Sequence, residues 1–416
     1  MESPSTSPTA NSEVSGLVII GGSYAGLNVA ASARQNGYTD RITMLTDESY
    51  LPYNRPPLSK GFLLGAVERD ALPLRGEPFY RDNAIDVVFG CRAEEIDRTG
   101  HVETSKGRFA FDKLAIATGT RARMLPLAGV DLDGVVTLRS LADADAIRAR
   151  MAGVGSVVIV GGGFIGLELA SSMVKAGLEV TVVEGMERVL ARVTGPTLSG
   201  FVEAEFAAHG ARVLCRTGVE SIEGQGGKVT GVRTADGARH PADLVVLAVG
   251  AVPNIELADH LGLASPEGIL VDQFGQTADP RIFSAGDCAF GMNLFAGHAI
   301  RLESVQNATD QGKAAGAAIA GREMVNATVP WFWSDQFDLK LQMVGLYQGS
   351  EAEVVRGSIE DRAFSIFYLR GDRIVAIDSV NKPGDNVLGR KLLKADHSVT
   401  VDQLADPDFD LRSLMA

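Results

Sequence analysis

The chain has 416 residues, of which 45% are hydrophobic and 22% charged, and its formal net charge is −13 from 39 basic and 52 acidic side chains. This composition is ordinary for a globular protein, and the length allows two or three domains with ample cores. The negative charge disfavours general binding to nucleic acid or to anionic membranes. No apolar run approaches the roughly 20 residues of a membrane-spanning helix, so we predict no membrane span.

The three cysteines, Cys91, Cys215 and Cys288, lie far apart and form no C-x-x-C or C-x₄-C pair. Neither a zinc site nor a redox disulfide is indicated, and we predict no metal centre. Free thiols are typical of a reducing compartment, so the sequence favours a cytoplasmic location. Residues 1–15 lack the basic and apolar regions of a signal peptide, and we predict a disordered tail there.

The first glycine-rich segment, GGSYAG at residues 21–26, follows the β-branched run Leu17–Ile20 and opens a helical pattern. A strand that leads into such a turn at a helix N-terminus binds a pyrophosphate through backbone N–H groups and the helix dipole. Ser23 replaces the middle glycine of the G-x-G-x-x-G pattern, which weakens this signal. Asp47 and Glu48 follow the next strand, and either can hold an adenosine ribose.

The segment PYNRPPLSK at residues 52–60 predicts a rigid cationic loop. Its three prolines remove N–H groups and φ freedom, while Arg55 and Lys60 add positive charge. Such a loop suits an anionic cofactor, whose charge lies on phosphates or on the N1 edge of a reduced flavin. Taken alone, the segment is more typical of a solvated proline-rich surface loop.

The second glycine-rich segment, GGGFIG at residues 161–166, follows Val157–Val160 and matches G-x-G-x-x-G in full. Glu184 lies 23 residues after Gly161, at the end of the next strand. A carboxylate there accepts hydrogen bonds from both ribose hydroxyls and repels a 2′-phosphate. This segment therefore predicts an NADH site, and it is the stronger of the two nucleotide signals.

Each strand–turn–helix–strand unit is followed later by an apolar strand that ends in glycine, at Leu114–Gly119 and at Leu244–Gly250. This alternation predicts parallel, doubly wound sheets, built twice. A Gly-Asp turn at Asp287 offers a carboxylate to polyol hydroxyls, and Glu303–Ala320 is predicted to form a helix. From residue 330 the pattern becomes strand-like, and we predict a smaller α+β domain over 330–416.

In their order and spacing, these residues resemble the FAD-dependent, NADH-using ferredoxin reductases of bacterial oxygenase systems, the putidaredoxin-reductase-like family. The resemblance covers about residues 16–395 and implies a glutathione-reductase-type α/β fold with two Rossmann-like domains. The NADH domain, 121–246, would be inserted in an FAD domain of 16–120 and 247–329, with the α+β domain after it. The resemblance rests on the two glycine turns and on the segments 55–60, 117–119, 286–287, 301–308 and 331–336.

The resemblance also implies roles for individual residues. Lys60 would stabilise the reduced flavin electrostatically, Glu168 matches the acidic position near the nicotinamide, and Trp333 matches the aromatic position by the flavin. The implied FAD-binding residues are Gly21, Ser23, Tyr24, Ala25, Gly26, Asp47, Glu48, Arg55, Lys60, Ala117, Thr118, Gly119, Arg123, Asp287, Glu303, Ser304, Val305 and Trp333. The implied NADH-binding residues are Gly161, Gly163, Phe164, Ile165, Gly166, Glu184 and Gly250.

The implied electron acceptor is a [2Fe-2S] ferredoxin that supplies an oxygenase, a haem monooxygenase in the favoured case. Two alternatives stay open: an NADH-binding flavoprotein like apoptosis-inducing factor, against which the net charge argues, and a flavoprotein that reduces a quinone or rubredoxin directly. An acidic ferredoxin would need a local cationic surface on this acidic chain. The candidates, which flank the recognised segments, are Arg301, Lys313, Lys340, Arg390 and Lys391.

Overall fold

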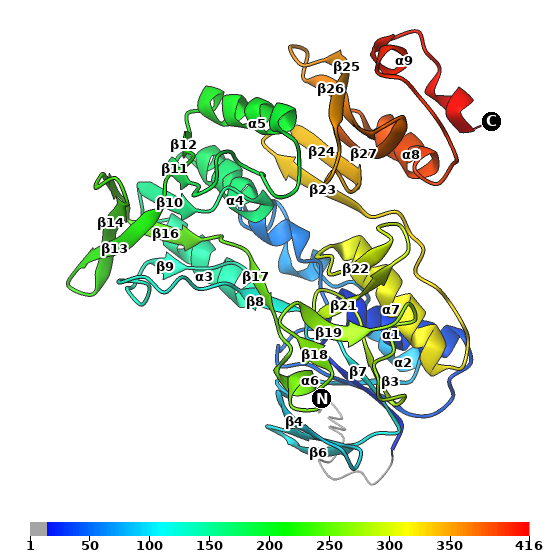
Figure 1. The fold of residues 1–416 in the computed structure, drawn as a ribbon. Coiled ribbons are helices and arrows are strands. Elements are labelled where there is room, and N and C mark those ends of the chain that lie inside the picture. The colour runs from blue at the N-terminus through cyan, green and yellow to red at the C-terminus, as the bar shows by residue number, and fades with distance from the viewer. Residues whose placement is uncertain (1–14, 416) are drawn as a thin grey trace. The chain divides into compact units, whose positions relative to one another are not determined.

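The computed structural model of the chain describes residues 15–415, and Figure 1 shows the order of their helices and strands. These residues form two compact units, each built from three segments of the chain. The first unit comprises 15–54, 70–121 and 252–328, and the second comprises 55–69, 122–251 and the residues from 329 onward. The predicted tail, apart from Ser15, lies outside the described residues.

A five-stranded parallel sheet forms the core of the first unit. Its strands in spatial order are β20 (Ile282–Ser284), β7 (Lys113–Ile116), β1 (Leu17–Ile20), β2 (Ile42–Leu45) and β3 (Ile85–Val88). Every residue of β1 and β2 is buried. Continuous apolar runs of this kind are expected where helices cover both faces of a parallel sheet.

Two long helices of the first unit, α1 (Tyr24–Gln35) and α7 (Val305–Ile319), lie in close contact. A glycine permits this approach, because a Cβ on Gly316 would come within 2.4 Å of the carbonyl oxygen of Val29. The absence of a side chain therefore lets the two backbones touch. The contact joins the N-terminal segment of the unit to its last segment.

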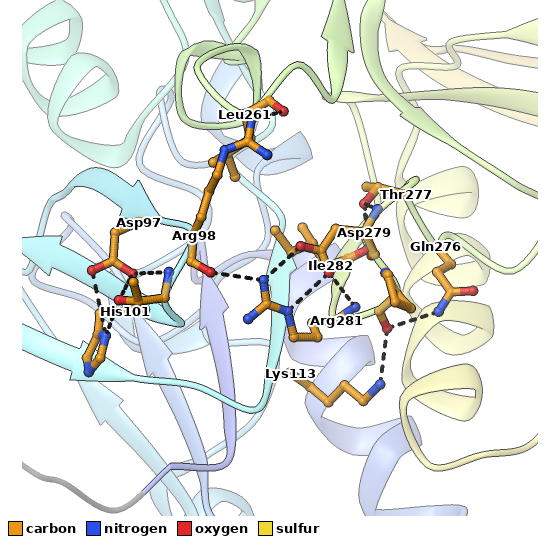
Figure 2. A network of polar contacts seen from close by, with 12 residues as sticks. Asp97, Arg98, His101, Lys113, Leu261, Gln276, Thr277, Asp279, Arg281 and Ile282 are labelled. Atoms are coloured by element: carbon orange, nitrogen blue, oxygen red, sulfur yellow. Dashed lines mark hydrogen bonds and ion pairs between the residues drawn. The ribbon is translucent and has the colours of Figure 1, made fainter.

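A polar network fixes the turn that precedes β20 (Figure 2). The Arg281 guanidinium donates to Asp279 Oδ2 at 2.9 Å and to the carbonyl oxygen of Arg98 at 3.3 Å. Lys113, at the start of β7, donates from Nζ to the carbonyl oxygen of Pro280 at 3.1 Å. Since Arg98 and Lys113 lie in the segment 70–121 and the other residues lie in the segment 252–328, these bonds join two segments of the first unit that are far apart in sequence.

Smaller elements complete the first unit. One antiparallel sheet contains β4 (Ala93–Asp97), β5 (His101–Thr104) and β6 (Gly107–Ala110). A second sheet contains β18 (Ala264–Ser265), β19 (Gly268–Val271), β21 (Ala289–Asn293) and β22 (His298–Ile300). The short helices are α2 (Glu77–Asp82) and α6 (Glu256–Asp259). Strand β8 (Thr120–Ala122) pairs with β17 (Ala251–Pro253), and the residues Ala122 and Ala251 of this pair are counted in the second unit.

The second unit contains another five-stranded parallel sheet. Its order is β12 (Arg212–Leu214), β11 (Glu179–Val183), β10 (Ser156–Val160), β16 (Leu244–Leu247) and β9 (Val135–Val136). The helices of this part are α3 (Leu141–Met151), α4 (Phe164–Lys175) and α5 (Pro196–Ala208). A three-stranded sheet contains β13 (Val219–Gln225), β14 (Lys228–Thr234) and β15 (Arg239–Pro241). The segment 55–69 contributes a 3₁₀ turn, η1 (Pro56–Ser59).

The C-terminal part of the second unit is a five-stranded antiparallel sheet. Its order is β23 (Trp331–Gln336), β24 (Leu339–Gly345), β27 (Arg373–Val380), β26 (Ala363–Arg370) and β25 (Ala352–Ser358). The helices are α8 (Pro383–Leu392) and α9 (Val401–Ala405), followed by the 3₁₀ helix η3 (Leu411–Met415). One apolar core runs through the unit, from Leu169 of α4 and Phe206 of α5 to Phe337, between β23 and β24, and Phe364 of β26.

A carboxylic acid lies buried within the second unit. Asp378 of β27 is 3% exposed, and its Oδ2 accepts from the Tyr368 hydroxyl at 2.7 Å and from the Thr194 hydroxyl. Burial raises the pKa of the Asp378 carboxyl from its ordinary 3.8 to about 7, and Glu353 adds to the rise through its negative charge. The hydrogen bonds from Thr194 and Tyr368 oppose the shift because they favour the charged form.

This raised pKa predicts how stability depends on pH. Between about pH 4 and pH 7 the folded chain keeps a proton on Asp378 that the unfolded chain has lost. The free energy of unfolding contributed by this group therefore falls as the pH rises through that window, and is constant above it. The free energy of unfolding, measured with denaturant at a series of pH values, should therefore fall less steeply between pH 4 and pH 7 in Asp378→Asn than in the wild type. The control Asp372→Asn, at an exposed position whose pKa is lowered, should keep the slope; an unchanged slope in Asp378→Asn would contradict the assignment.

Candidate functional site

The first glycine turn of the chain forms a cradle that a side chain would fill. Gly21 has φ +115°, and a Cβ there would lie 2.2 Å from the carbonyl oxygen of Ala117. A Cβ on Gly26 would lie 2.0 Å from the carbonyl oxygen of Gly21. Ser23, the residue that departs from the glycine pattern, has φ −142° and ψ −159° at the N-cap of α1. Because this is extended backbone, a serine fits without strain.

The helix N-terminus behind this turn is suited to an anion. No acidic side chain lies in the first turn of α1, so the positive end of the helix dipole faces no carboxylate from its own helix. The cradle and the helix end together fit the pyrophosphate of a dinucleotide such as FAD.

The predicted FAD-binding segments of the first unit follow the carboxyl ends of its parallel strands. Parallel strands end at the same edge of a sheet, which is where open α/β sheets bind their ligands. The segments begin at Gly21 after β1, at Asp47 beyond β2, at Ala117 after β7 and at Asp287 beyond β20. The fold therefore gathers residues that are far apart in sequence at one edge.

Hydrogen bonds brace the side chains and loops at this edge. Glu48 is half-buried and accepts from the Tyr53 hydroxyl at 2.5 Å, whereas Asp47 is exposed. The Tyr24 hydroxyl donates to Asn54 Oδ1 at 2.6 Å.

The segments that follow β7 and β20 are held in the same way. Asn254 Nδ2 donates to the Thr118 carbonyl at 2.9 Å, Thr120 Oγ1 donates to Asp287 Oδ2 at 3.4 Å, and Arg301 Nη1 donates to Glu303 Oε1 at 2.5 Å. Ser304 caps α7, its hydroxyl accepting from the Asn307 N–H at 3.0 Å.

Four of the predicted FAD-binding residues, Arg55, Lys60, Arg123 and Trp333, belong to the second unit. Arg55 Nη1 donates to the Arg139 carbonyl at 2.6 Å. Arg123 is exposed, and its backbone N–H donates to the Gly250 carbonyl at 3.0 Å. The ring of Trp333 lies 5.4 Å from that of Trp331, between centroids.

Lys60 and Glu168, two of the predicted catalytic residues, meet in a buried cluster of the second unit. Glu168 lies on α4 and is 3% exposed. Its Oε1 accepts from Lys60 Nζ at 2.7 Å and from the Ser334 hydroxyl at 2.7 Å, while Oε2 accepts from the Ser59 hydroxyl at 2.5 Å. Asp335 Oδ2 lies 3.7 Å from Lys60 Nζ. A buried carboxylate needs such a counter-charge and donors, and here it has both.

Sequence reasoning missed Ser59 and Ser334. Each is the chain neighbour of a residue that was predicted, Lys60 or Trp333. A lone serine carries no spacing signal, so the only available clue was the buried acid, which requires donors beyond one lysine.

The second glycine turn repeats the geometry of the first. Gly161 has φ +110°, and a Cβ there would lie 2.4 Å from the carbonyl oxygen of Ala248. A Cβ on Gly166 would lie 2.1 Å from the Gly161 carbonyl oxygen, whereas one on Gly163 would meet nothing within 4 Å. The first turn of α4 contains no acidic side chain. This turn therefore also fits a pyrophosphate.

Glu184 lies beside this turn, at the end of β11. Its Oε2 accepts from the Gly162 N–H at 2.7 Å and its Oε1 from the Met186 N–H at 2.7 Å. Each carboxylate oxygen can accept a further hydrogen bond, so the Glu184 side chain, although fixed by these contacts, can still accept hydrogen bonds from the hydroxyls of a ribose. Gly250, with φ +101°, follows β16 at the carboxyl edge of the same sheet.

The start of α4 contacts the C-terminal sheet. The Phe164 ring lies 4.7 Å from that of Phe332 on β23. Its neighbour Ile165 is 46% exposed and available to a ligand. Among residues 15–415, no helix is long and apolar enough to cross a membrane.

Comparison with known proteins places this arrangement in a family. Residues 15–312 match the family described as pyridine nucleotide-disulphide oxidoreductase, and residues 331–415 match the family described as reductase C-terminal. Rhodocoxin reductase of Rhodococcus erythropolis is 42% identical over 402 residues, which cover 96% of this chain and 94% of that protein.

Two solved structures share the fold over nearly their whole length. The ferredoxin reductase for the CYP199A2 system of Rhodopseudomonas palustris is 42% identical with a TM-score of 0.93, covering 96% of this chain and 100% of the other. The reductase in the covalent putidaredoxin reductase–putidaredoxin complex is 36% identical with a TM-score of 0.92, covering 97% and 98%. The fold class and the resemblance predicted from sequence are thereby confirmed. The chain belongs to the pyridine nucleotide-disulphide oxidoreductase family, as one of its FAD-dependent, NADH-using ferredoxin reductases.

Proposed function

We propose that the chain carries electrons from NADH through FAD to a [2Fe-2S] ferredoxin that serves an oxygenase, a haem monooxygenase in the favoured case. The observation that carries this proposal is the presence of one pyrophosphate cradle in each unit, each at the carboxyl edge of a parallel sheet. When bound, FAD supplies the chemistry, since it accepts a hydride and releases electrons singly. The three cysteines are all free, so no disulfide takes the electron pair.

We propose that the first cradle binds FAD and the second binds NADH. Residues 16–120 and 247–329 bind FAD, with Gly21–Gly26 on its pyrophosphate and Asp287 on its ribityl hydroxyls. Residues 121–246 bind NADH, with Gly161–Gly166 on the pyrophosphate and Glu184 on the adenosine ribose. Roles for Arg55, Lys60, Arg123 and Trp333 at the flavin stay predictions that rest on the resemblance.

We propose that Lys60 supplies positive charge to the reduced cofactor and that Glu168 holds the ammonium in place. The 2.7 Å contact between Lys60 Nζ and Glu168 Oε1 restricts an otherwise flexible side chain. Ser59 donates to Oε2 and Ser334 to Oε1 of the carboxylate, and the two bonds help to fix its orientation. The chain is proposed to work in the cytoplasm, because its free thiols suit a reducing compartment.

The docking candidates differ in how far their charge is already compensated. Arg390 and Lys391 form no ion pair with a carboxylate within residues 15–415, and the Arg390 guanidinium lies 5.0 Å from the Trp331 ring centroid. The compensated pairs are Arg301 with Glu303 at 2.5 Å, Lys313 with Asp310 at 3.5 Å and Lys340 with Asp335 at 2.8 Å. We therefore propose Arg390 and Lys391 of α8 as the principal contacts for an acidic ferredoxin.

The function is tested with the purified holoenzyme, NADH and a panel of acceptors. Cytochrome c reduction should require an added [2Fe-2S] ferredoxin, whereas ferricyanide should be reduced without one. Equal or faster turnover with rubredoxin or a quinone would favour a direct reductase. Slow flavin reduction that no ferredoxin accelerates would favour the NADH-binding protein without reductase activity.

Substitution of Lys60 tests the buried cluster. Lys60→Met should lower the free energy of unfolding by about 3 kcal/mol, because it leaves a buried carboxylate without its counter-charge. Adding Glu168→Gln should restore most of this loss, since the amide is neutral and its carbonyl oxygen still accepts from a serine hydroxyl. Denaturant unfolding of all the variants measures both changes. A double variant no more stable than Lys60→Met would show that the unpaired charge is not the cause.

Substitution of Glu184 tests the NADH assignment. Glu184→Ala should reduce the preference for NADH over NADPH on the order of tenfold, or ~1.4 kcal/mol, because it removes both a ribose acceptor and the repulsion of a 2′-phosphate. Steady-state ferricyanide reduction with each nucleotide measures this preference. Glu187→Ala is the control, since that exposed carboxylate lies on the same loop. Unchanged kinetics with both nucleotides would remove Glu184 from the site.

Charge reversal on α8 tests the docking surface. Arg390→Glu and Lys391→Glu should slow ferredoxin-dependent cytochrome c reduction about tenfold at low ionic strength, and less at high salt. Ferricyanide reduction should be unchanged, because it needs no docked protein. Lys228→Glu, at an exposed position on β14, controls for the change in net charge. If ferricyanide and ferredoxin rates fell equally, α8 would not be the docking surface.

A further inference from the structure

The loop between β11 and α5, residues 184–195, lies against the second glycine turn. The Leu190 N–H donates to the Gly162 carbonyl at 3.0 Å, and Glu184 accepts from the Gly162 N–H at 2.7 Å. Leu190 has φ +55°, a left-handed conformation that is costly for a branched residue and persists only where its surroundings enforce it. The shape of the nucleotide-binding turn is therefore coupled to the shape of this loop.

Two side chains of the C-terminal sheet reach the carbonyl groups of this loop. The Tyr347 hydroxyl donates to the Ala191 carbonyl at 2.7 Å, and Gln348 Nε2 donates to the Arg192 carbonyl at 2.9 Å. Both residues lie between β24 and β25, some 156 positions further along the chain. Neither belongs to the nucleotide-binding segment; the Tyr347 ring packs near that of Tyr368, 5.6 Å away between centroids, while its hydroxyl points to the loop.

The end of the loop is held by the buried acid of β27. The Thr194 hydroxyl donates to Asp378, and the Gly195 N–H donates to the Tyr368 hydroxyl at 3.1 Å. The Tyr368 hydroxyl in turn donates to Asp378 Oδ2 at 2.7 Å. Thr194, Tyr368 and Asp378 are each 3% exposed or less, so water does not compete for these bonds.

We propose that Tyr347, Gln348 and the Tyr368–Asp378 pair are positioning residues for NADH, which hold loop 184–195 in the shape that the nucleotide binds. This inference rests on the proposed function, in which Gly161–Gly166 and Glu184 form the NADH site. A loop that is already ordered loses less conformational entropy when its ligand binds. The C-terminal sheet thus contributes to NADH affinity through the hydrogen bonds that Tyr347, Gln348, Tyr368 and Asp378 make with the loop.

Apolar contacts also anchor the loop, because Val189 and Leu190 are buried in the apolar core of the unit. Loss of one hydroxyl should therefore loosen the loop without unfolding it. The effect of such a loss falls on NADH binding and not on the chemical step, since Lys60 and Glu168 form a separate cluster. A purely structural role would instead change thermal stability alone.

The test compares Tyr347→Phe and Gln348→Ala with the wild-type holoenzyme. Each should raise KM for NADH about threefold to tenfold, while kcat for ferricyanide reduction at saturating NADH stays the same. Tryptic cleavage after Arg192, whose side chain is exposed, should be faster in each variant. An unchanged KM and an unchanged cleavage rate would overturn the proposal.

A matched control lies in the same sheet. The Ser365 hydroxyl donates to Asp385 Oδ2 at 2.7 Å and lies 3.0 Å from the Ser379 hydroxyl, from which it can accept, so Ser365→Ala removes hydrogen bonds within the sheet without touching the loop. It should lower Tm and leave KM for NADH as in the wild type. If its KM rose as much as that of Tyr347→Phe, the effect would be general softening of the sheet and the proposal would fail.

Glu184→Ala separates failure of this inference from failure of the proposed function. If Glu184→Ala raises KM for NADH and Tyr347→Phe does not, the NADH site stands and the positioning role alone is wrong. If neither variant changes KM, the nucleotide site is misassigned and the positioning role falls with it.

Discussion

A single buried carboxylate joins the three segments of the second unit. Glu168 comes from the helix behind the second glycine turn, Lys60 and Ser59 come from the segment 55–69, and Ser334 comes from the C-terminal sheet. A carboxylate at this depth is tolerated only while its charge and lone pairs are satisfied. The short segment 55–69 thus adopts its place through ionic and polar contacts as well as through apolar packing.

The two glycine turns depend on a different constraint, the close approach of backbone to backbone. Gly21 lies against Ala117 and Gly161 against Ala248, and in both places the Cβ of any other residue would overlap a carbonyl oxygen. The positive φ of both glycines makes the same demand independently. These positions are therefore fixed by geometry within each sheet, before any contact with a nucleotide is considered.

This difference explains what could be predicted from the sequence. Glycine turns, apolar strands and the acid at the end of the second strand are local patterns, so the doubly wound sheets and the place of Glu184 beside the second glycine turn could be predicted from spacing. Ser59 and Ser334 join the site through contacts 109 and 166 positions away in sequence. The local sequence pattern of hydrophobic and polar residues does not predict such contacts, because they depend on how helices and strands pack against one another.

Ser23 departs from the glycine pattern, and the structure accommodates it without strain. The sequence raised doubt about this turn because a Cβ replaces the middle glycine. In the structure that residue is the extended N-cap of α1, where a side chain is allowed. The requirement for glycine thus differs between the positions of the pattern. At the first and last positions a Cβ would overlap backbone atoms of the chain itself, whereas at the middle position a Cβ is excluded only where a ligand approaches closely.

The C-terminal sheet contributes to both the core and the candidate site of the second unit. It shares an apolar core with the parallel sheet of the second unit, supplies Ser334 to the buried carboxylate, and contacts Phe164 at the glycine turn through Phe332. The helix α8 packs on its strands β24 and β27 and carries Arg390 and Lys391, which form no ion pair with a carboxylate of the described residues 15–415. Because the sheet that contacts the second glycine turn also packs against α8, the proposed NADH site and the proposed ferredoxin contacts rest on the same sheet, and a substitution in that sheet has to be assayed for both.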